Sequence, residues 1–388
     1  MFDLWSWRRA LSERWKTTKR DLAALSSLWL GKGAAPVFVQ RPRHPQTFVP
    51  RLLRVMHVRR ETEDALTLCL QDPLDLPIRY LPGQFFTVQI AIDGVTYRRA
   101  YSASTYVPDG RSLTLTCKRI LGGLVSGYLH QHSHPAMMLQ VLGPSGRFVV
   151  TPSKENQRRL VLIAGGSGIT PLHCILGAVL TVEPESQITL IYGNRSWKGI
   201  IFADSLAELS ARFPNRFSVH HILQDGTGTD VGVLDREVLS AKLQTLAPDA
   251  GDVQYFVCGP QGMMDAARSV LFEKGVPKER IFEEHFATPQ YTANNLPKIG
   301  FPVDISHRET SRTIDVKPDE TLLEAGLRHG ISLPFSCTMG GCGACKGKLL
   351  EGQVTLPQPN CLTEEEEEAG EILLCVAHPT SPCRIKVE

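Results

Sequence analysis

The sequence predicts a multidomain fold in which three architectures follow one another: an antiparallel β-barrel, an α/β domain with a parallel sheet, and a small α+β domain. Three observations support this prediction. Strand-like runs alternate with turns over residues 48–150, as in small antiparallel barrels. Glycine-rich turns follow apolar runs in residues 151–287, as in open α/β sheets. Residues 300–388 combine a hairpin pattern, a short helix and closely spaced cysteines.

Length and composition agree with several globular domains. The chain has 388 residues, of which 42% are hydrophobic and 21% charged, and about 100 to 200 residues per domain predicts two to four domains. A formal net charge of +2 gives no reason to expect nucleic acid as a partner. Residues 300–388 are nevertheless acidic, with 14 acidic and 8 basic side chains. No apolar run reaches 18 residues, so we expect no membrane-spanning helix.

The first 47 residues are expected to form an amphipathic extension. Four of the five tryptophans lie in the first 30 residues, and positions 11, 15, 22, 25 and 29 are apolar at helical spacing among basic residues. Such a helix suits a membrane interface, although packing on the protein's own surface or on a partner protein explains it equally well. No signal peptide is evident, because charges precede the apolar run and no convincing cleavage site follows. We expect a cytoplasmic protein, with peripheral membrane contact through residues 1–30 as one option.

Residues 48–150 contain two motifs that could bind a flavin. Arg99, Tyr101 and Ser102 belong to the run RAYS, and the run GGLVS, from Gly122 to Ser126, follows Lys118. A flavin needs a surface against its ring, a hydrogen-bond donor near N5, and cationic or helix N-terminal groups for its phosphates. Taken alone, an Arg-Tyr-Ser strand is usually an ordinary half-exposed surface, so these motifs need support from the rest of the chain.

Residues 151–287 predict a nucleotide site. An apolar run at 160–164 leads into the turn GGSGITP at 165–171 and then a helical pattern at 172–180. A strand, a glycine turn and a helix together place a pyrophosphate against the N–H groups of a helix N-terminus. Two further runs, at 188–192 and 254–257, end in YGNRS and CGPQGMM. The carboxyl ends of parallel strands are where ligands bind in such sheets, so the three turns indicate a mononucleotide-binding half.

The last domain carries a cysteine pattern that predicts a 2Fe-2S cluster. Its four cysteines have the spacing C-x4-C-x2-C-x29-C, at Cys337, Cys342, Cys345 and Cys375. This is the plant-type spacing of four thiolate ligands, and the glycines between them allow the backbone to wrap around one point. The alternative is a four-cysteine zinc site, but such sites usually show paired C-x2-C spacings.

The sequence around these cysteines resembles the plant-type ferredoxin family over about the last 90 residues. Residues 301–306 and 312–316 read as a hairpin, residues 319–328 as a short helix, and the run LTEEEEEAGEILLCVAHP carries the fourth cysteine. The resemblance implies a β-grasp fold. Thr338 stands where many members have a basic residue. The acidic run at 364–368 is a solvated face or a surface that steers a basic acceptor, and residues 288–299 read as a loose linker.

The ordered motifs of the first two domains resemble the ferredoxin-NADP reductase superfamily. The resemblance implies FAD, with FMN as the alternative: Arg99 would pair with the pyrophosphate, Tyr101 would lie along the flavin, and Ser102 would approach N5. It also implies catalytic roles for Ser102 and Cys258, and a place near the nicotinamide and flavin for Glu284. The other expected cofactor-binding positions are Lys118, Gly122, Gly123, Ser126, Gly165, Gly166, Gly168, Thr170, Pro171, Gly259, Pro260 and Met263.

The residues after the second strand of the nucleotide domain favour NADPH over NADH. A 2′-phosphate calls for cationic and hydroxyl donors at that place, whereas a free ribose calls for an acidic acceptor. Arg195 and Ser196, with Lys198 nearby, fit the phosphate. The alternative is that Arg195 is only a solvated loop residue.

The fused reductase and ferredoxin resemblances imply an electron-transfer enzyme. NADPH would reduce FAD, and FAD would pass electrons one at a time to the 2Fe-2S cluster and on to an external protein, with the chain positioning and tuning its cofactors. The expected acceptor is an oxygenase or a fatty-acyl desaturase. The alternatives are a reductase of a soluble metalloprotein such as a hybrid-cluster protein, and a redox-sensing module without turnover.

Overall fold

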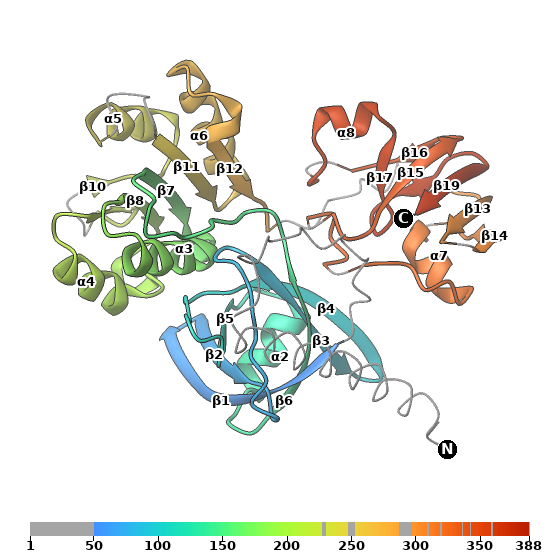
Figure 1. Ribbon diagram of the computed structural model, residues 1–388, viewed down its shortest axis with the longest axis horizontal. Helices are drawn as coiled ribbons and strands as arrows, with labels where there is room; N and C mark the ends of the chain where they lie inside the picture. Colours follow the sequence, from blue (N-terminus) through green and yellow to red (C-terminus); the bar gives the residue numbers. More distant parts are fainter. Residues whose placement is uncertain are drawn as a thin grey trace, which may run out of the picture. The chain divides into compact units, whose positions relative to one another are not determined.

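The computed structural model of the chain describes residues 50–226, 230–246, 253–286, 297–308, 310–318, 320–335, 337–341, 343–357 and 360–387. The expected amphipathic extension, most of the expected linker and Cys342 lie outside these ranges. The described residues form three main sheets and a two-stranded one, shown from blue to red along the chain in Figure 1. The domain boundaries expected after residues 47, 150, 287 and 299 stay predictions.

The first sheet is antiparallel throughout and has the strand order β4-β3-β6-β1-β2-β5. Alternate residues such as Leu66, Leu68 and Leu70 are buried on its inner face, as the period of two requires. A bridge between Ala103 and Leu115 joins the two edges, so the sheet closes as the expected barrel. Its elements are β1 (Arg51–Thr62), β2 (Ala65–Gln71), β3 (Phe85–Ile92), β4 (Val95–Ser102), β5 (Leu113–Lys118), α2 (Leu124–His132) and β6 (Met138–Ser145).

The second sheet is parallel, with the strand order β10-β9-β8-β7-β11-β12. The order reverses direction beside β7, which makes the edge between β7 and β11 the switch point where open α/β sheets bind ligands. The strands are β7 (Arg159–Gly165), β8 (Gln187–Asn194), β9 (Phe217–Leu223), β10 (Asp230–Val231), β11 (Val253–Cys258) and β12 (Ile281–Glu284). The helices are α3 (Ile169–Val182), α4 (Ala203–Arg212), α5 (Arg236–Leu246) and α6 (Gln261–Glu273), with 3₁₀ turns at Gly166–Gly168, Trp197–Gly199 and Lys278–Arg280.

Helix α3 begins three residues earlier than the pattern at 172–180 predicts. The glycine turn ends at Gly168, and Pro171 then occupies the first helical turn, where its missing N–H costs no hydrogen bond. No helix in the described part of the chain has the length and hydrophobicity needed to cross a bilayer.

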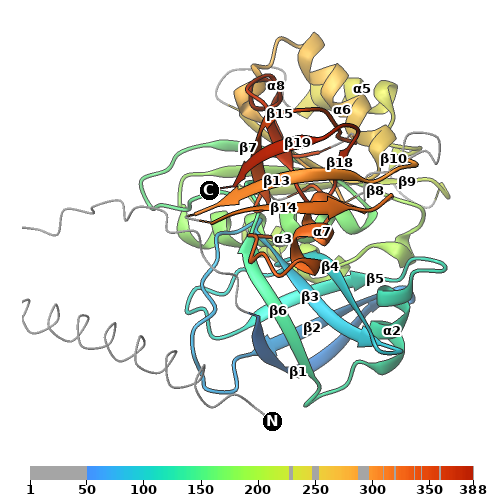
Figure 2. The ribbon, with the colours of Figure 1, turned by 90° about the vertical axis from the view of Figure 1, so that its right-hand side faces the viewer.

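The third sheet has the order β14-β13-β19-β15-β17 and mixes one parallel pair, β13 with β19, with antiparallel pairs. Helix α7 packs against β14 (Figure 2), which gives the expected β-grasp arrangement. The predicted helix at 319–328 begins only at Leu322, because Thr321 forms a capping box with Glu324. The elements are β13 (Phe301–His307), β14 (Thr310–Val316), α7 (Leu322–Arg328), β15 (Lys346–Glu351), β16 (Val354–Thr355), α8 (Glu364–Glu368), β17 (Glu371–Leu373), β18 (His378–Pro379) and β19 (Cys383–Val387).

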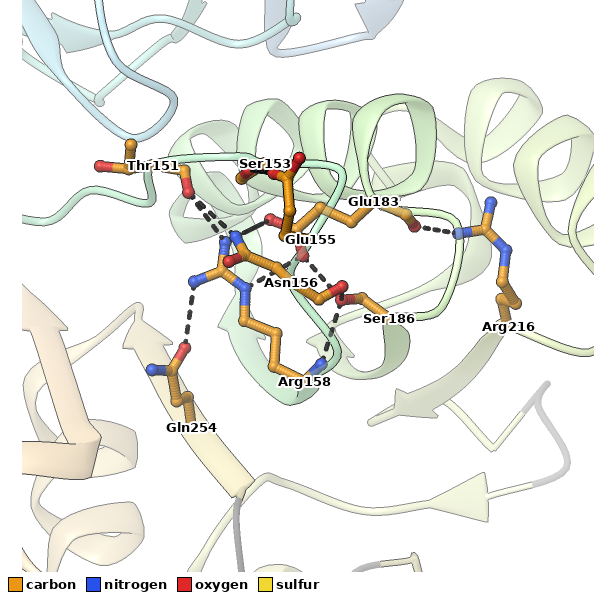
Figure 3. A network of polar contacts seen from close by, with 9 residues as sticks. All are labelled: Thr151, Ser153, Glu155, Asn156, Arg158, Glu183, Ser186, Arg216 and Gln254. Atoms are coloured by element: carbon orange, nitrogen blue, oxygen red, sulfur yellow. Dashed lines mark hydrogen bonds and ion pairs between the residues drawn. The ribbon is translucent and has the colours of Figure 1, made fainter.

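A buried ionic network fixes the start of the parallel sheet. Glu183, which has no exposed surface, pairs with Arg158 and accepts hydrogen bonds from Asn156 at 2.9 Å and Ser186 at 2.7 Å (Figure 3). Arg216 donates to the backbone oxygen of Glu183. Because Glu183 follows the last residue of α3, the network ties the segment before β7 to the end of this helix and so sets where β7 enters the sheet.

Candidate functional site

Residues from all three sheets or their adjoining loops line a cavity of about 490 Å³. Its size is that of a cofactor or substrate site. Seven of the predicted flavin- and nucleotide-binding residues line it: Arg99, Tyr101, Ser102, Lys118, Gly123, Ser126 and Thr170. Residues of the cluster loop, Cys337, Met339 and Gly341, line the same cavity. The two flavin motifs, the nucleotide turn and the cysteine loop therefore meet at one place.

Strand β4 supplies the barrel side of the cavity. Arg99 Nη1 donates to the backbone oxygen of Arg98 at 2.7 Å, and Tyr101 Oη accepts a hydrogen bond from Cys117 Sγ at 3.4 Å. Burial raises the pKa of Tyr101 well above its ordinary value, so its ring presents a neutral, largely apolar face. Lys118 Nζ lies 3.5 Å from Asp64 Oδ2, and Lys118 lines the cavity.

The N-terminus of α2 supplies an anion site next to these residues. Gly122, with φ +72°, turns the chain, and Gly123 caps the helix. The Ser126 hydroxyl accepts from the N–H of Ile120 at 3.1 Å and donates to the Gly123 oxygen at 3.3 Å, which holds the turn closed. The first helical turn has no acidic residue, so its free N–H groups favour a phosphate. Gly122 itself does not line the cavity.

Ser102 and Glu284 line the cavity and are joined by a hydrogen bond. Ser102 Oγ donates to Glu284 Oε2 at 3.1 Å, and Ser102 is only 2% exposed. Burial raises the pKa of Glu284 to about 8, against the opposing effect of the Ser102 hydrogen bond, so this carboxyl is mostly protonated at neutral pH. Cys258 pairs with Glu284 between β11 and β12. Its thiol is fully buried and does not line the cavity, and burial raises its pKa.

The turns after β7 and β11 touch each other, and this contact explains their small residues. A Cβ on Gly168 would lie 2.0 Å from the backbone oxygen of Cys258, and one on Gly165 would lie 2.6 Å from Pro260 Cδ. The N-termini of α3 and α6 follow these turns, and neither first turn has an acidic residue. The predicted residues in this pair of turns lie outside the cavity lining: Gly165, Gly166, Gly168, Pro171, Gly259, Pro260 and Met263.

Arg195 and Ser196 lie apart from the cavity, in the turn after β8. The backbone oxygen of Arg195 accepts from the N–H of Asp225 at 3.1 Å, which leaves the exposed Arg195 side chain free to extend from a fixed backbone. The ring of the neighbouring Trp197 lies 5.3 Å from that of His221. This turn follows the strand next to β7, so it lies on the same edge of the sheet as the glycine turns.

The described cluster cysteines are buried together. Cys337, Cys345 and Cys375 are 1%, 2% and 6% exposed, and the hydrogen bonds that the Cys375 thiol makes to Cys337 and Cys345 raise its pKa. The N–H of Met339 donates to Cys337 Sγ at 3.4 Å, a typical contact for a thiolate ligand. Among the described residues, no group of three or more His, Cys, Asp or Glu side chains is arranged to hold a metal ion, and Cys342 lies outside them. Converging thiols in a wrapped, glycine-containing loop fit a 2Fe-2S cluster.

Several lining residues carry no signal in the sequence. Phe85 and Thr116 come from ordinary strand positions, and Ser167 lies inside a turn whose sequence signal comes from its glycines. Glu284, which the family resemblance already implies near the flavin, is 182 positions from its partner Ser102. The ends of β4 and β12 bring this pair together, and no local pattern reports that contact.

Comparisons with known proteins agree with this arrangement. Three protein-family models match in the order of the three sheets: an oxidoreductase FAD-binding domain over residues 53–150, an oxidoreductase NAD-binding domain over 162–269, and a 2Fe-2S iron-sulfur cluster binding domain over 305–380. The solved structure of phthalate dioxygenase reductase, described as a modular structure for electron transfer from pyridine nucleotides to [2Fe-2S], covers 89% of this chain and 99% of its own at 21% identity and a TM-score of 0.61.

Curated relatives match along most of their length. A component of the 1,2-phenylacetyl-CoA epoxidase of Escherichia coli is 36% identical over 338 residues, covering 84% of this chain and 94% of the relative. The ferredoxin reductase component of 3-ketosteroid-9-alpha-monooxygenase from Mycobacterium tuberculosis is 33% identical, covering 85% and 93%. The reductase component of glycine betaine monooxygenase from Chromohalobacter salexigens is 29% identical, covering 86% and 94%.

Proposed function

The chain belongs to the family of NAD(P)H-dependent FAD reductases that carry a C-terminal 2Fe-2S domain and serve oxygenases, and from this premise we propose that it is the reductase component of an oxygenase and draws its electrons from NADPH. When bound, FAD takes up an electron pair from the nicotinamide and the cluster carries single electrons onward. The observation that carries this proposal is the cavity, in which Ser102 and Glu284 share one space with Cys337 and Met339.

For FAD we propose roles that follow from the cavity lining and the helix N-terminus. Arg99 and Lys118 neutralise the pyrophosphate, and the N–H groups that follow Gly122 and Gly123 bind it, with Ser126 holding their turn. Tyr101 covers the flavin and ribityl chain. Ser102 stands at N5 as a hydroxyl whose direction Glu284 fixes.

For the nicotinamide nucleotide we propose binding across the switch point. Gly165, Gly166, Gly168, Thr170 and Pro171 form the pyrophosphate turn, because the start of α3 presents free N–H groups there. Opposite them, the turn after β11 borders the nicotinamide ring with Cys258, Gly259, Pro260 and Met263. The close contact between the two turns supports a ligand laid along their shared edge.

Arg195 and Ser196 would recognise the 2′-phosphate of NADPH. Replacing Arg195 with Ala removes the cation while the backbone bond to Asp225 stays. We expect KM for NADPH to rise roughly 10- to 100-fold, since a hydrogen bond to a charged group contributes about 1.5–3 kcal/mol, with KM for NADH nearly unchanged. Steady-state kinetics with both nucleotides measures this. An equal rise for both would mean that Arg195 does not read the phosphate.

For the cluster we propose Cys337, Cys342, Cys345 and Cys375 as ligands, with Cys342 assigned from its spacing alone. An oxygenase is the favoured acceptor, because the curated relatives are components of an epoxidase and of monooxygenases. A fatty-acyl desaturase, a hybrid-cluster protein and a redox-sensing role stay alternatives from the sequence. We also propose a cytoplasmic location. Membrane contact through residues 1–30 is tested by liposome binding after deletion of residues 1–40.

The proposed function is tested by distinguishing electron transfer through the cluster from electron transfer directly from the flavin. With Cys345→Ser we expect NADPH-dependent reduction of cytochrome c to be abolished, because the cluster is lost, while ferricyanide reduction by the flavin continues. Cys383→Ser is the matched control, since this cysteine is equally buried in the same domain and lies outside the ligand pattern. If the unmodified protein shows no turnover with any of the acceptors tested, the reductase assignment is wrong and a redox-sensing role is favoured.

A further inference from the structure

The cluster loop lines the proposed flavin cavity. The structure therefore has the third sheet placed for electron transfer from the flavin to the 2Fe-2S cluster. Met339 and Gly341 lie between the predicted ligands Cys337 and Cys342, and they line the same space as Ser102 and Glu284. An oxygenase that took electrons from this side of the loop would compete with the flavin for the same surface. The contacts that hold the loop at the cavity therefore bear directly on the order of electron transfer.

One such contact joins the turn after β6 to α8. Arg147 Nη1 lies 3.2 Å from Glu366 Oε1, with exposed fractions of 63% and 26% for the two side chains. The same Glu366 oxygen pairs with Lys346, which directly follows the ligand Cys345. Glu366 also forms the capping box of α8 with Thr363. Glu366 is thus fixed from its own domain and presents its carboxylate to Arg147.

A second contact involves the segment that precedes the cluster loop in the sequence. The guanidinium of Arg98 lies 5.3 Å from the centroid of the Phe335 ring, a cation–π distance. Phe335 comes two residues before Cys337 and packs against the core of the third sheet, while Arg98 adjoins Arg99 on β4. Contacts from the barrel therefore reach segments before and after the ligand loop.

The acidic run of α8 is accordingly only partly available to a partner. Glu366 contacts Lys346 and Arg147, and Glu367 accepts from the Asn360 amide at 3.0 Å. Exposed ion pairs are weak and are screened by salt. A contact of this kind can hold the loop at the cavity and still release it when a competing protein arrives.

We propose that Arg147 is a positioning residue, whose ion pair with Glu366 forms a salt-sensitive latch that holds the 2Fe-2S domain at the flavin cavity for internal electron transfer and releases it for the acceptor. This inference rests on the proposed function for its purpose. The latch predicts the position of the 2Fe-2S domain, and that position can be measured without any acceptor.

The experiment compares the holoprotein with Arg147→Glu and, as a matched control, Arg111→Glu. Arg111 is also a barrel arginine, 71% exposed, and its partner Asp109 belongs to the barrel as well. Small-angle scattering and amide exchange of α8 are recorded at low and high salt. Arg147 is the residue to change, because replacing Glu366 would also remove the α8 cap and the Lys346 pair.

At low salt we expect Arg147→Glu to show the larger radius of gyration and faster α8 exchange that the unmodified protein reaches only at high salt, and Arg111→Glu to behave as unmodified. Stopped-flow reduction should show flavin reduction by NADPH unchanged and the following cluster reduction slowed by roughly two- to five-fold, the worth of an exposed ion pair. The latch is refuted if Arg147→Glu matches Arg111→Glu in scattering and exchange. Failure of the proposed function would instead appear as absent turnover in an otherwise normal latch.

Discussion

Ser102 and Glu284 form the most unusual residue pair of the site. A carboxyl group in a polar, solvated place ionises near pH 4.5, but burial raises the pKa of Glu284 to about 8. At neutral pH the folded protein therefore keeps a proton on Glu284, and its neighbour Ser102 stays in a neutral environment. A neutral carboxyl can both donate and accept a hydrogen bond, which suits it to orient a hydroxyl beside a ring that changes charge on reduction.

The raised pKa of Glu284 predicts a pH dependence of stability. Between its ordinary value of 4.5 and about 8, the folded state binds a proton that the unfolded state has lost, so the free energy of unfolding falls as pH rises through this window. Glu284→Gln cannot ionise and should flatten this slope. Melting temperatures of the flavin-free protein at pH 6 and pH 8 measure it.

The adjacent Glu283 provides the control for this prediction. Its carboxylate pairs with Arg268 at 3.0 Å, outside the cavity. Glu283→Gln should keep the decline in melting temperature between pH 6 and pH 8. Equal slopes in the unmodified protein and Glu284→Gln would show that Glu284 is ionised at neutral pH.

The sequence identifies residues whose chemistry is local and misses those whose role depends on tertiary contact. Seven of the predicted flavin- and nucleotide-binding residues line the cavity, because glycine turns, an Arg-Tyr-Ser strand and a helix N-terminus each have a local sequence pattern. The Ser102–Glu284 hydrogen bond has no such pattern, because strand ends far apart in the sequence create it. Cys258, expected to be catalytic, is fully buried behind the cavity, and its role stays a prediction.

At the scale of elements, the junction of β7, α3 and β11 requires a residue without a side chain at Gly168. Gly168 has φ −61°, which any residue can adopt, so its requirement is space and not backbone conformation. The backbone oxygen of Cys258 occupies the place of its Cβ. Hydrophobic periodicity predicts the strands and helices well, but this contact between two turns is set by their packing.

We therefore expect Gly168→Ala to force the two turns apart. Overpacking of this kind costs about 1–3 kcal/mol, and it displaces the proposed pyrophosphate turn, so hydride transfer from NADPH should slow at least ten-fold. Thermal unfolding and stopped-flow flavin reduction measure the two effects.

Gly177→Ala, in the helix α3 that follows Gly168, is the control for this substitution. Its Cβ would lie 3.8 Å from Tyr106 Cβ, an ordinary contact, and alanine favours a helix over glycine by up to about 1 kcal/mol. We expect this variant to be as stable as the unmodified protein or more so, with normal hydride transfer. A normal Gly168→Ala variant would show that the turns can separate at no cost.

At the scale of the molecule, the hydrophobic cores divide differently from the three sheets. Ala65, Phe148 and Val150 of the barrel region pack in one cluster with residues of the parallel sheet. His173 of α3 adds a 2.6 Å hydrogen bond to the backbone oxygen of Ser104. The core of the third sheet contains only residues between Val303 and Val387. Sequence periodicity predicts each sheet but cannot show which sheets share a core.

This division predicts that the chain can be cut in two before residue 297 but not between the barrel and the parallel sheet. Residues 1–296 should reduce ferricyanide with NADPH at the rate of the full chain, because both flavin and nucleotide surfaces stay on one shared core. Residues 297–388 should bind the cluster, which its visible absorption reports. A cut near residue 150 should give insoluble or flavin-free halves, because it divides the hydrophobic core that contains Phe148 and Val150.

Mixing the two fragments measures what the covalent link contributes. Residues 288–299 are expected from the sequence to be a loose linker, and a linker of that kind gives an effective concentration on the order of 1 mM. With each fragment at about 1 μM, cytochrome c reduction should therefore fall roughly 10³-fold and rise in proportion to the 297–388 fragment. A rate that is independent of fragment concentration would mean that the domains bind tightly without the linker. In that case the exposed Arg147–Glu366 ion pair could not govern release, and a larger interface would have to hold the domains together.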